Sequence, residues 1–441
     1  MRYQRAMEKI REFHHFQLRN GIDCLLAESA LFKTVTMQVV FTLPLSKFDA
    51  PQQAMLPGLL SRSCAKHPGL AALTRYCEEL YGTTIRARAR KVGQQHVLSI
   101  SLATPAAKYV PNGDAHLQRV FELAYELIAN PRIERPYGMK SGHFPREVFI
   151  SQQEQLLRSI ESEINDKGSY ALRHALEANF AGSAYGIPET GGARAPLMVD
   201  NQGAFRRYTE MLRAAPLAIY VNGPIDVKRV GKQLAKIFEK IERVPQAQQI
   251  PVKLNKAARH WPKMRKSMDY AQMEQSFLVL SHTTGANIAH RDFPALRFAD
   301  AIFGRLSTSR LFRVIREDEG LAYSVASSLS ETTGLNLAWV GCDLEKLPRA
   351  SQLVKRELKR LKTKGFDDAE FESARASLLT ELSLEQDQHG ARIASLIVQQ
   401  SVGKLITHDQ QLEAMRKVTP EQVQRAFQRF TPRLEYRLEP L

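Results

Sequence analysis

The chain has 441 residues, 44% of them hydrophobic and 24% charged, and a formal net charge of +16. This length suits roughly two to four domains with their own cores, and the composition is that of an ordinary globular protein. There is no run of about 18 apolar residues and no apolar core of a secretory signal near the N-terminus, so we expect no membrane span and a cytoplasmic location.

The cysteines and the basic residues argue against a disulfide-linked or cysteine-zinc protein and against a nucleic-acid-binding protein. The four cysteines, Cys24, Cys64, Cys77 and Cys342, form no C-x-x-C pair, so neither a disulfide framework nor a cysteine zinc site is expected. The basic residues are spread along the chain. One dense basic stretch, Lys355–Lys364, is expected to be helical and has no interleaved aromatic side chains. The pattern is typical of a solvated helix face rather than of nucleic-acid binding.

The first half of the chain alternates strand and helix patterns. Apolar and polar side chains alternate over Thr34–Leu43 with the period of a half-buried strand, and Gly82 is a stop signal for a preceding helix. The other elements expected here are strands at Phe13–Leu18, Asp23–Ala27, Thr83–Val92, His96–Leu102 and Leu217–Val221, helices at Gln52–Ala65, His116–Ile128 and Gln202–Ala214, and a long helical region from Pro145 to Phe180.

The second half repeats this order of elements. A strand, two helical stretches, a strand pair, a helix and a long helix are expected at Ser276–Leu280, Pro294–Phe303, Thr308–Gly320, Ala322–Ser328, Leu335–Val340, Leu347–Lys362 and Asp367–Gln388. The repeated order predicts an internal duplication with a period of about 200 residues. We therefore predict an N-terminal half at 1–244, a basic, proline-containing linker at 245–266, and a C-terminal half at 267–441.

Several segments then resemble one known family. The segment SRLFRVIREDEGLAYSV, Ser309–Val325, resembles the second-half signature of the insulinase or pitrilysin-type zinc metallopeptidases, which include insulysin and the subunits of mitochondrial processing peptidase. The first half matches at Lys33–Leu45, Cys77–Gly82 and Asn165–Gly192. The resemblance implies two homologous α+β halves, each an antiparallel sheet with helices packed mainly on one face. Within the family, the chain is most similar to bacterial inactive members known as elongation factor P 5-aminopentanol modification-associated proteins.

The zinc motif of the active members is missing. Those members carry H-x-x-E-H on a first-half helix, where two histidines bind zinc and the glutamate activates water. The aligned residues, Leu56–Leu60, read Leu-Pro-Gly-Leu-Leu, and no histidine lies between His15 and His67. We therefore expect no bound metal, no cofactor and no catalytic residue: the chain reads as a pseudo-metallopeptidase.

Two residue pairs match other parts of the family's active site. Glu154 and Glu161 are seven residues apart on one helix, the spacing of two glutamates in active members. The resemblance makes Glu161 the former zinc carboxylate, and the alternative is two solvated glutamates. Arg316 and Tyr323 match residues that line the chamber wall and contact substrate in active members. The alternative is a buried tyrosine and an arginine paired with Glu317 or Glu319.

A row of arginines also stands out on one expected strand. The segment TIRARARKV places Arg86, Arg88 and Arg90 on one face and small or apolar side chains on the other. Such a face could bind an acidic partner or peptide, or could simply be solvated.

These observations lead to one main functional hypothesis and two alternatives. The resemblance implies a non-catalytic subunit that pairs with an active zinc-binding homologue in a heterodimer, or self-associates, and binds or helps to process peptides. The alternatives are a scaffold protein in a translation-factor modification pathway and an active hydrolase with an unrecognised site.

Overall fold

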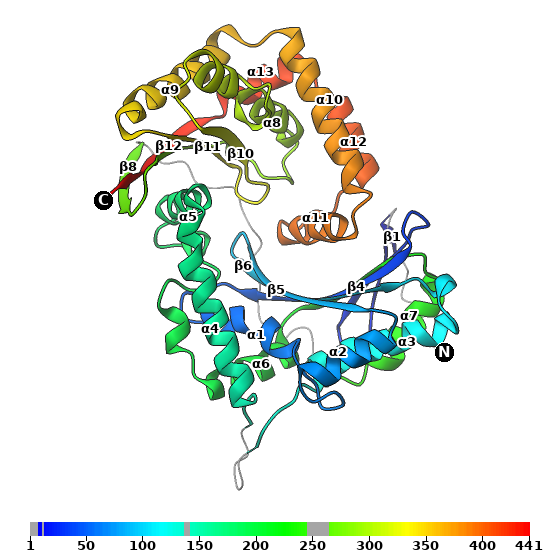
Figure 1. The fold of residues 1–441 in the computed structure, drawn as a ribbon. Coiled ribbons are helices and arrows are strands. Elements are labelled where there is room, and N and C mark those ends of the chain that lie inside the picture. Colours follow the sequence, from blue (N-terminus) through cyan, green and yellow to red (C-terminus); the bar gives the residue numbers. More distant parts are fainter. Residues whose placement is uncertain (1–7, 11–12, 136–141, 245–263) are drawn as a thin grey trace. The chain divides into compact units, whose positions relative to one another are not determined.

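A computed structural model describes residues 8–10, 13–135, 142–244 and 264–441. They divide into two compact units, each with its own sheet and helices (Figure 1). Unit 1 comprises Met1–Glu161 and Ile187–Lys253, and unit 2 comprises Ser162–Gly186 and Leu254–Leu441. The predicted linker at 245–266 lies outside the described residues except for its last three, of which Arg265 and Lys266 already belong to a strand of unit 2.

Unit 1 contains a seven-stranded sheet with the order β1-β2-β3-β7-β4-β6-β5. All neighbours are antiparallel except β3 and β7, which run parallel. The strands are β1 (Glu8–Ile10), β2 (Phe13–Gln17), β3 (Asp23–Glu28), β4 (Thr34–Pro44), β5 (Thr84–Val92), β6 (Gln95–Pro105) and β7 (Leu217–Gly223).

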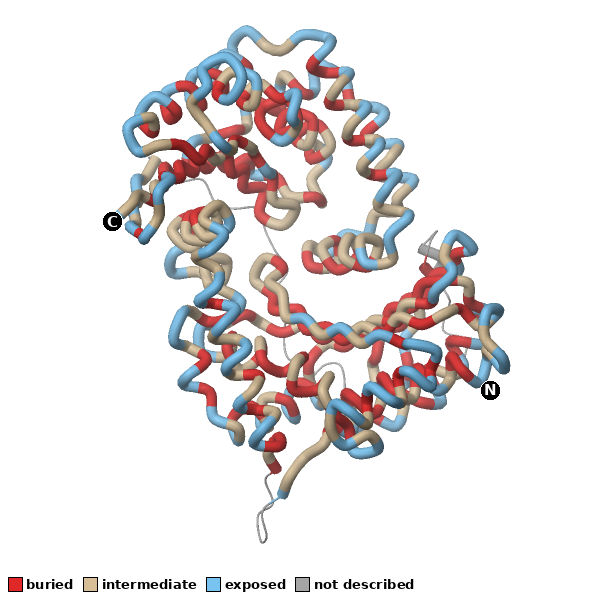
Figure 2. The backbone as a smooth tube through the Cα atoms, viewed as in Figure 1, coloured by how far each residue is buried: buried red, intermediate tan, exposed pale blue. Residues whose placement is uncertain are grey.

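The helices of unit 1 pack on one face of this sheet. Helix α1 contacts β5 and β6, α3 contacts β6, and α7 contacts β3. The alternating side chains Val35, Met37 and Val39 of β4 point into the core between sheet and helices, where the buried residues gather in Figure 2. The helices are α1 (Ala50–Leu60), α2 (Leu70–Glu79), α3 (Gly113–Ala129), α4 (Arg146–Ser162), α6 (Asn201–Ala214) and α7 (Val227–Phe238).

Unit 2 contains a five-stranded sheet with the order β10-β11-β9-β12-β8. It too has one parallel pair, β12 with β8. The strands are β8 (Arg265–Ala271), β9 (Ser276–Thr283), β10 (Ser324–Leu329), β11 (Leu335–Cys342) and β12 (Thr431–Pro440). The predicted two-unit α+β class is confirmed, with mixed rather than purely antiparallel sheets.

Most helices of unit 2 share one core with one face of the sheet, where Leu278, Leu280 and Val340 are buried. Two π-helical segments interrupt the regular helices in the first part of this unit, at Ala301–Arg305 and Phe312–Asp318. The regular helices are α8 (Phe293–Asp300), α9 (Leu347–Lys364), α10 (Asp368–Glu385), α11 (His389–Ser401), α12 (His408–Arg416) and α13 (Pro420–Gln428).

Helix α5 (Lys167–Asn179) covers the other face of the unit 2 sheet, although it precedes the predicted linker. It contacts β9, β11 and β12, and its small residues Ala171 and Ala175 are fully buried there. The region expected to be helical from Pro145 to Phe180 is helical but divided in two. Helix α4 ends at Ser162, and α5 begins after Asp166, whose side chain accepts a hydrogen bond from the Ser169 amide at 3.1 Å.

Candidate functional site

The helix segment that should carry the zinc ligands is part of the unit 1 core. Leu56, Leu59 and Leu60 on α1 are at most 2% exposed, and all three belong to the same hydrophobic cluster. Pro57 lies inside the helix, where it cannot donate a backbone hydrogen bond. Aliphatic side chains have no lone pair for a metal and cannot accept a proton from water. These three positions therefore stabilise the fold and can neither bind zinc nor activate water.

Gly58 lies at the contact between α1 and α4. A Cβ atom built on Gly58 would come within 1.8 Å of the terminal amide of Gln152. With the Gln152 amide oriented so that its oxygen faces Arg62, that oxygen accepts from Arg62 Nε at 2.9 Å and from Nη2 at 3.0 Å. Arg62 Nη2 also donates to Gln155 Oε1 at 2.9 Å. A permanently charged guanidinium thus lies beside this contact, where it disfavours a bound cation.

Glu154 and Glu161 lie on the outer side of α4. Both are exposed, and Glu154 pairs with Arg158 at 3.4 Å. At about 100° per residue, both glutamates fall roughly opposite Gln152, which is the α4 side chain facing α1. Two turns beyond Gln152 the same face carries Ser159, whose hydroxyl donates to the Leu156 carbonyl at 2.7 Å. The structure therefore does not bring either glutamate to α1.

Sequence reasoning missed Gln152 because it relied on acidic residues at a seven-residue spacing. A signal was present in the apolar spacing of α4, where Phe149, Leu156 and Ile160 pack inward. Gln152 falls on that face and is itself buried. Across the described residues, no group of three or more histidine, cysteine, aspartate or glutamate side chains could hold a metal ion.

Arg316 and Tyr323 flank the turn between the π-helix Phe312–Asp318 and strand β10 in unit 2. Gly320, with a φ of 57°, ends the helical segment in the left-handed conformation that glycine adopts readily. Tyr323 is 57% exposed, and its hydroxyl donates to Asp343 Oδ1 at 3.3 Å. The tyrosine is thus not buried in the strand.

The Arg316 side chain is exposed as well. Its guanidinium lies 5.0 Å from the centre of the Phe312 ring, a cation–π contact. Glu319 instead accepts from Arg349 Nη2 at 2.6 Å, and within the described part of the chain Arg316 forms no ion pair with Glu317. Its five donors therefore face solvent on a folded turn, available to a ligand.

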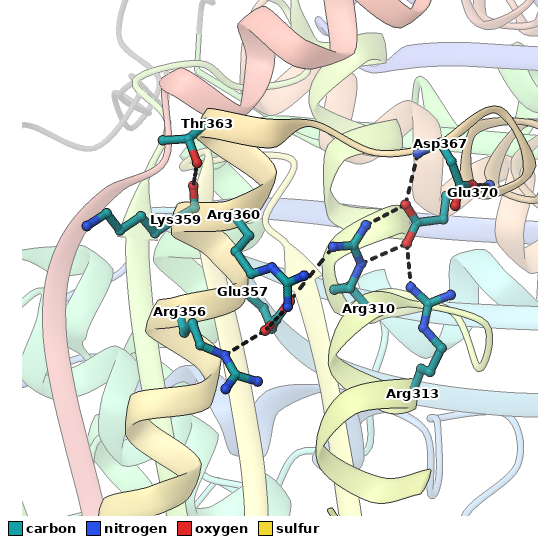
Figure 3. Close-up of polar contacts among 9 residues, drawn as sticks. All are labelled: Arg310, Arg313, Arg356, Glu357, Lys359, Arg360, Thr363, Asp367 and Glu370. Carbon is teal, nitrogen blue, oxygen red and sulfur yellow. Dashed lines mark hydrogen bonds and ion pairs between the residues drawn. The ribbon is translucent and has the colours of Figure 1, made fainter. Parts of the chain in front are cut away.

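A network of charged side chains anchors the segment that carries Arg316 (Figure 3). Arg310 donates from Nε and Nη2 to the two carboxylate oxygens of Glu370 on α10, at 2.8 and 2.6 Å. Arg313 Nη2 adds a third bond to Glu370 at 2.9 Å, and Arg310 Nη1 lies 3.8 Å from the fully buried Glu357 of α9. Bidentate pairs of this kind fix orientation as well as distance.

The pKa of Glu370 reflects this network. Burial alone would raise its pKa, but the hydrogen bonds from Arg310 and the Asp367 amide, with the charges of Arg310 and Arg313, more than reverse that effect. The pKa is therefore lowered, and Glu370 is charged at neutral pH. The ionised carboxylate ties the π-helical segment to α10.

Comparisons with known proteins agree with this geometry. Residues 206–378 match the family profile described as "Peptidase M16 inactive domain". The chain is 24% identical to the probable inactive metalloprotease YmfF of Bacillus subtilis (strain 168), over 92% of this chain and 93% of that protein. It is 29% identical to an uncharacterized zinc protease of the same strain, YmxG, over 28% of this chain and 30% of that protein.

The fold recurs in a solved structure of similar size. A peptidase M16 inactive domain from Pseudomonas fluorescens superposes with a TM-score of 0.77 at 17% identity, covering 97% of this chain and 98% of that chain. Together with the family profile and the Bacillus subtilis relative, this match confirms the predicted resemblance to the inactive branch of this peptidase family.

Across the described residues, no helix combines the length and apolar character needed to cross a membrane.

Proposed function

Since the chain is an inactive homologue of the M16, or insulinase-type, peptidases, we propose that it is the non-catalytic subunit of a peptidase assembly. In this proposal it pairs with an active homologue that carries the H-x-x-E-H motif. The active partner supplies the zinc and the activated water, and this chain supplies surface that binds the substrate peptide.

The observation that carries the proposal is the contrast between the two sites. In unit 1, the α1 positions for the zinc ligands are leucines packed in the core, and Gly58 leaves space only for the Gln152 amide. In unit 2, Arg316 and Tyr323 are exposed on an anchored turn. A chain that has lost metal chemistry while presenting ordered donors is suited to binding rather than to hydrolysis.

Pairing is supported by the relatives of this chain. The same Bacillus subtilis strain contains both a probable inactive metalloprotease and an uncharacterized zinc protease that match it. An inactive and a zinc-containing homologue within one organism provide the two components that such an assembly requires. Arg316 offers a permanent charge and a rigid fork of donors for a peptide carbonyl or carboxylate.

Co-expression with a zinc-motif homologue from the same genome tests the proposal. The two chains should elute together in size-exclusion chromatography at micromolar concentration, and the peptidase turnover of the active chain should rise when this chain is added. Separate elution together with unchanged turnover would contradict the proposed subunit role.

A further inference from the structure

Strand β5 presents a row of three arginines on the sheet face that the helices of unit 1 do not cover. Ile85, Ala87 and Ala89 point to the other face and pack against the unit 1 core, on the side that α1 contacts. Because side chains alternate along a strand, Arg86, Arg88 and Arg90 all project away from that core. Arg86 and Arg88 are exposed, and Arg90 is partly buried.

The strand positions beside these arginines carry no charge. Arg86, Arg88 and Arg90 are paired in register with Ser101, Ser99 and Val97 of β6. The next strand, β4, continues the same rows with Gln38, Val40 and Thr42. Within the described residues, none of the three arginines forms an ion pair. The row is therefore a set of neighbouring positive charges that no ion pair neutralises there.

The arginines also repel one another. Alternate residues of a strand are roughly 6.6–6.8 Å apart, which places each arginine within the Debye length of about 8 Å from the next one in physiological salt. Burial lowers the pKa of Arg90; Tyr220 opposes this effect, and the charge of Arg88 adds to it. A bound anion would relieve this repulsion, and each arginine fork can take a carboxylate in a bidentate pair.

We propose that this arginine row binds an extended acidic segment of a polypeptide, with carboxylates at alternate positions that match the repeat of Arg86, Arg88 and Arg90. This inference rests on the proposed function and names the class of peptide that the subunit selects. An extended strand repeats its side chains at the same interval as β5, so successive carboxylates reach successive arginines.

The neighbouring side chains favour a polypeptide over a single-stranded nucleic acid. Binders of single strands stack bases on exposed aromatic rings, and the β6 and β4 positions beside the arginines are serine, valine, glutamine and threonine. Tyr220, which lies near Arg90, is only 1% exposed and cannot stack a base.

The test is fluorescence anisotropy of the isolated full chain with a labelled peptide in which glutamate alternates with threonine. The double variant R86Q/R88Q should bind this peptide at least about tenfold more weakly than the unaltered chain. The matched control K359Q/K364Q removes the same charge from two exposed lysines of α9 and should bind within about twofold of the unaltered chain. Equal melting temperatures of both variants show that the fold is intact.

Three results would overturn the inference: equal loss in both variants, equal binding of a peptide with the same glutamates in one block, or tighter binding of single-stranded RNA. The measurement uses the chain without a partner, so its failure is separable from failure of the proposed function. A chain that ignores the acidic peptide yet elutes with its active homologue would contradict this inference alone.

Discussion

Gly58 on α1 lies directly against the side-chain amide of Gln152 on α4, and a Cβ atom at Gly58 would approach that amide to 1.8 Å. In an active homologue, the corresponding helices would carry the zinc ligands. Here the space between them holds an uncharged amide that is hydrogen-bonded to Arg62. The contact between α1 and α4 is filled by these side chains.

Gly58→Ala should destabilise the chain by about 1 kcal/mol, because the new methyl group displaces Gln152 from Arg62. The lost bond to a charged donor costs roughly 1.5–3 kcal/mol, partly offset by the better helix propensity of alanine, about 1 kcal/mol. Urea unfolding measures the change.

The same substitution in a Gln152→Ala background is the control. Without the Gln152 amide, only the helix propensity remains, so Gly58→Ala should be neutral or stabilising by up to about 1 kcal/mol. Equal destabilisation in both backgrounds would show that the contact with Gln152 does not fix the identity of residue 58.

Much of the fold could be predicted from sequence because its signals are local. The alternation in Thr34–Leu43 and the glycine stop at Gly82 correspond to β4 and to the end of the turn after α2. The loss of the zinc motif could also be read directly, since leucines occupy the aligned positions and no histidine lies between His15 and His67 to restore the motif in another register.

The remaining features depend on contacts between distant residues. Nothing local shows that α5 packs against β9 and β12, because its buried alanines are equally compatible with other neighbours. The seven-residue spacing of Glu154 and Glu161 places them on one helix face, but only the packing of α4 shows that this face is the outer one. Gln152 was missed because the prediction followed the acidic residues, although the apolar spacing of α4 places it on the buried face.

Arg316→Lys and Tyr323→Phe should leave the melting temperature almost unchanged and lower the turnover of the reconstituted complex. Both side chains are exposed, so each change in stability should stay within about 0.5 kcal/mol. Loss of a donor to a developing oxyanion costs about 2.7–4 kcal/mol of transition-state stabilisation, which is the size of the turnover loss expected if these residues act there.

Arg291→Lys and Tyr270→Phe are the matched controls, because both residues are exposed and lie away from the turn. They should leave turnover unaltered. If the Arg316 and Tyr323 variants behave like these controls, the two residues do not belong to the working surface of the complex.

Arg310→Met should be among the most destabilising substitutions in unit 2, by about 3 kcal/mol or more. Its removal leaves Glu357 and Glu370, both largely buried, without their central partner. Arg313→Met should cost less than about 1 kcal/mol, because Arg313 is partly exposed and Glu370 keeps Arg310. Chemical unfolding of both variants provides the comparison, and similar losses would contradict the central position of Arg310.

Asp300 should produce a pH-dependent component of stability. Burial raises its pKa from 3.8 to about 6, against the hydrogen bonds from Ser327 and Asn336 and the charges of Arg305 and Arg297. A raised carboxylate pKa contributes stability that is present below the unfolded value and lost as pH rises through the folded value. As the pH rises from 3.8 to above 6, ionisation of Asp300 should therefore lower the free energy of unfolding by on the order of 3 kcal/mol.

Asp300→Asn removes this ionisation while its carbonyl oxygen can still accept from Ser327. The stability of the variant relative to the unaltered chain should rise from pH 4 to pH 7 by about 3 kcal/mol. Burial lowers the pKa of the nearby His282 to about 4, so His282 makes the free energy of unfolding rise with pH. This contribution is the same in the variant and in the unaltered chain, and it cancels when their stabilities are subtracted. A flat difference across this range would show that Asp300 is not protonated in the folded state.

The most direct test of the central claim is the zinc content of the purified chain. The protein is saturated with zinc, dialysed and measured by elemental mass spectrometry beside an active homologue that carries H-x-x-E-H. We predict less than about one tenth of a zinc ion per chain, against about one in the homologue. About one zinc ion per chain, retained through dialysis, would contradict this prediction.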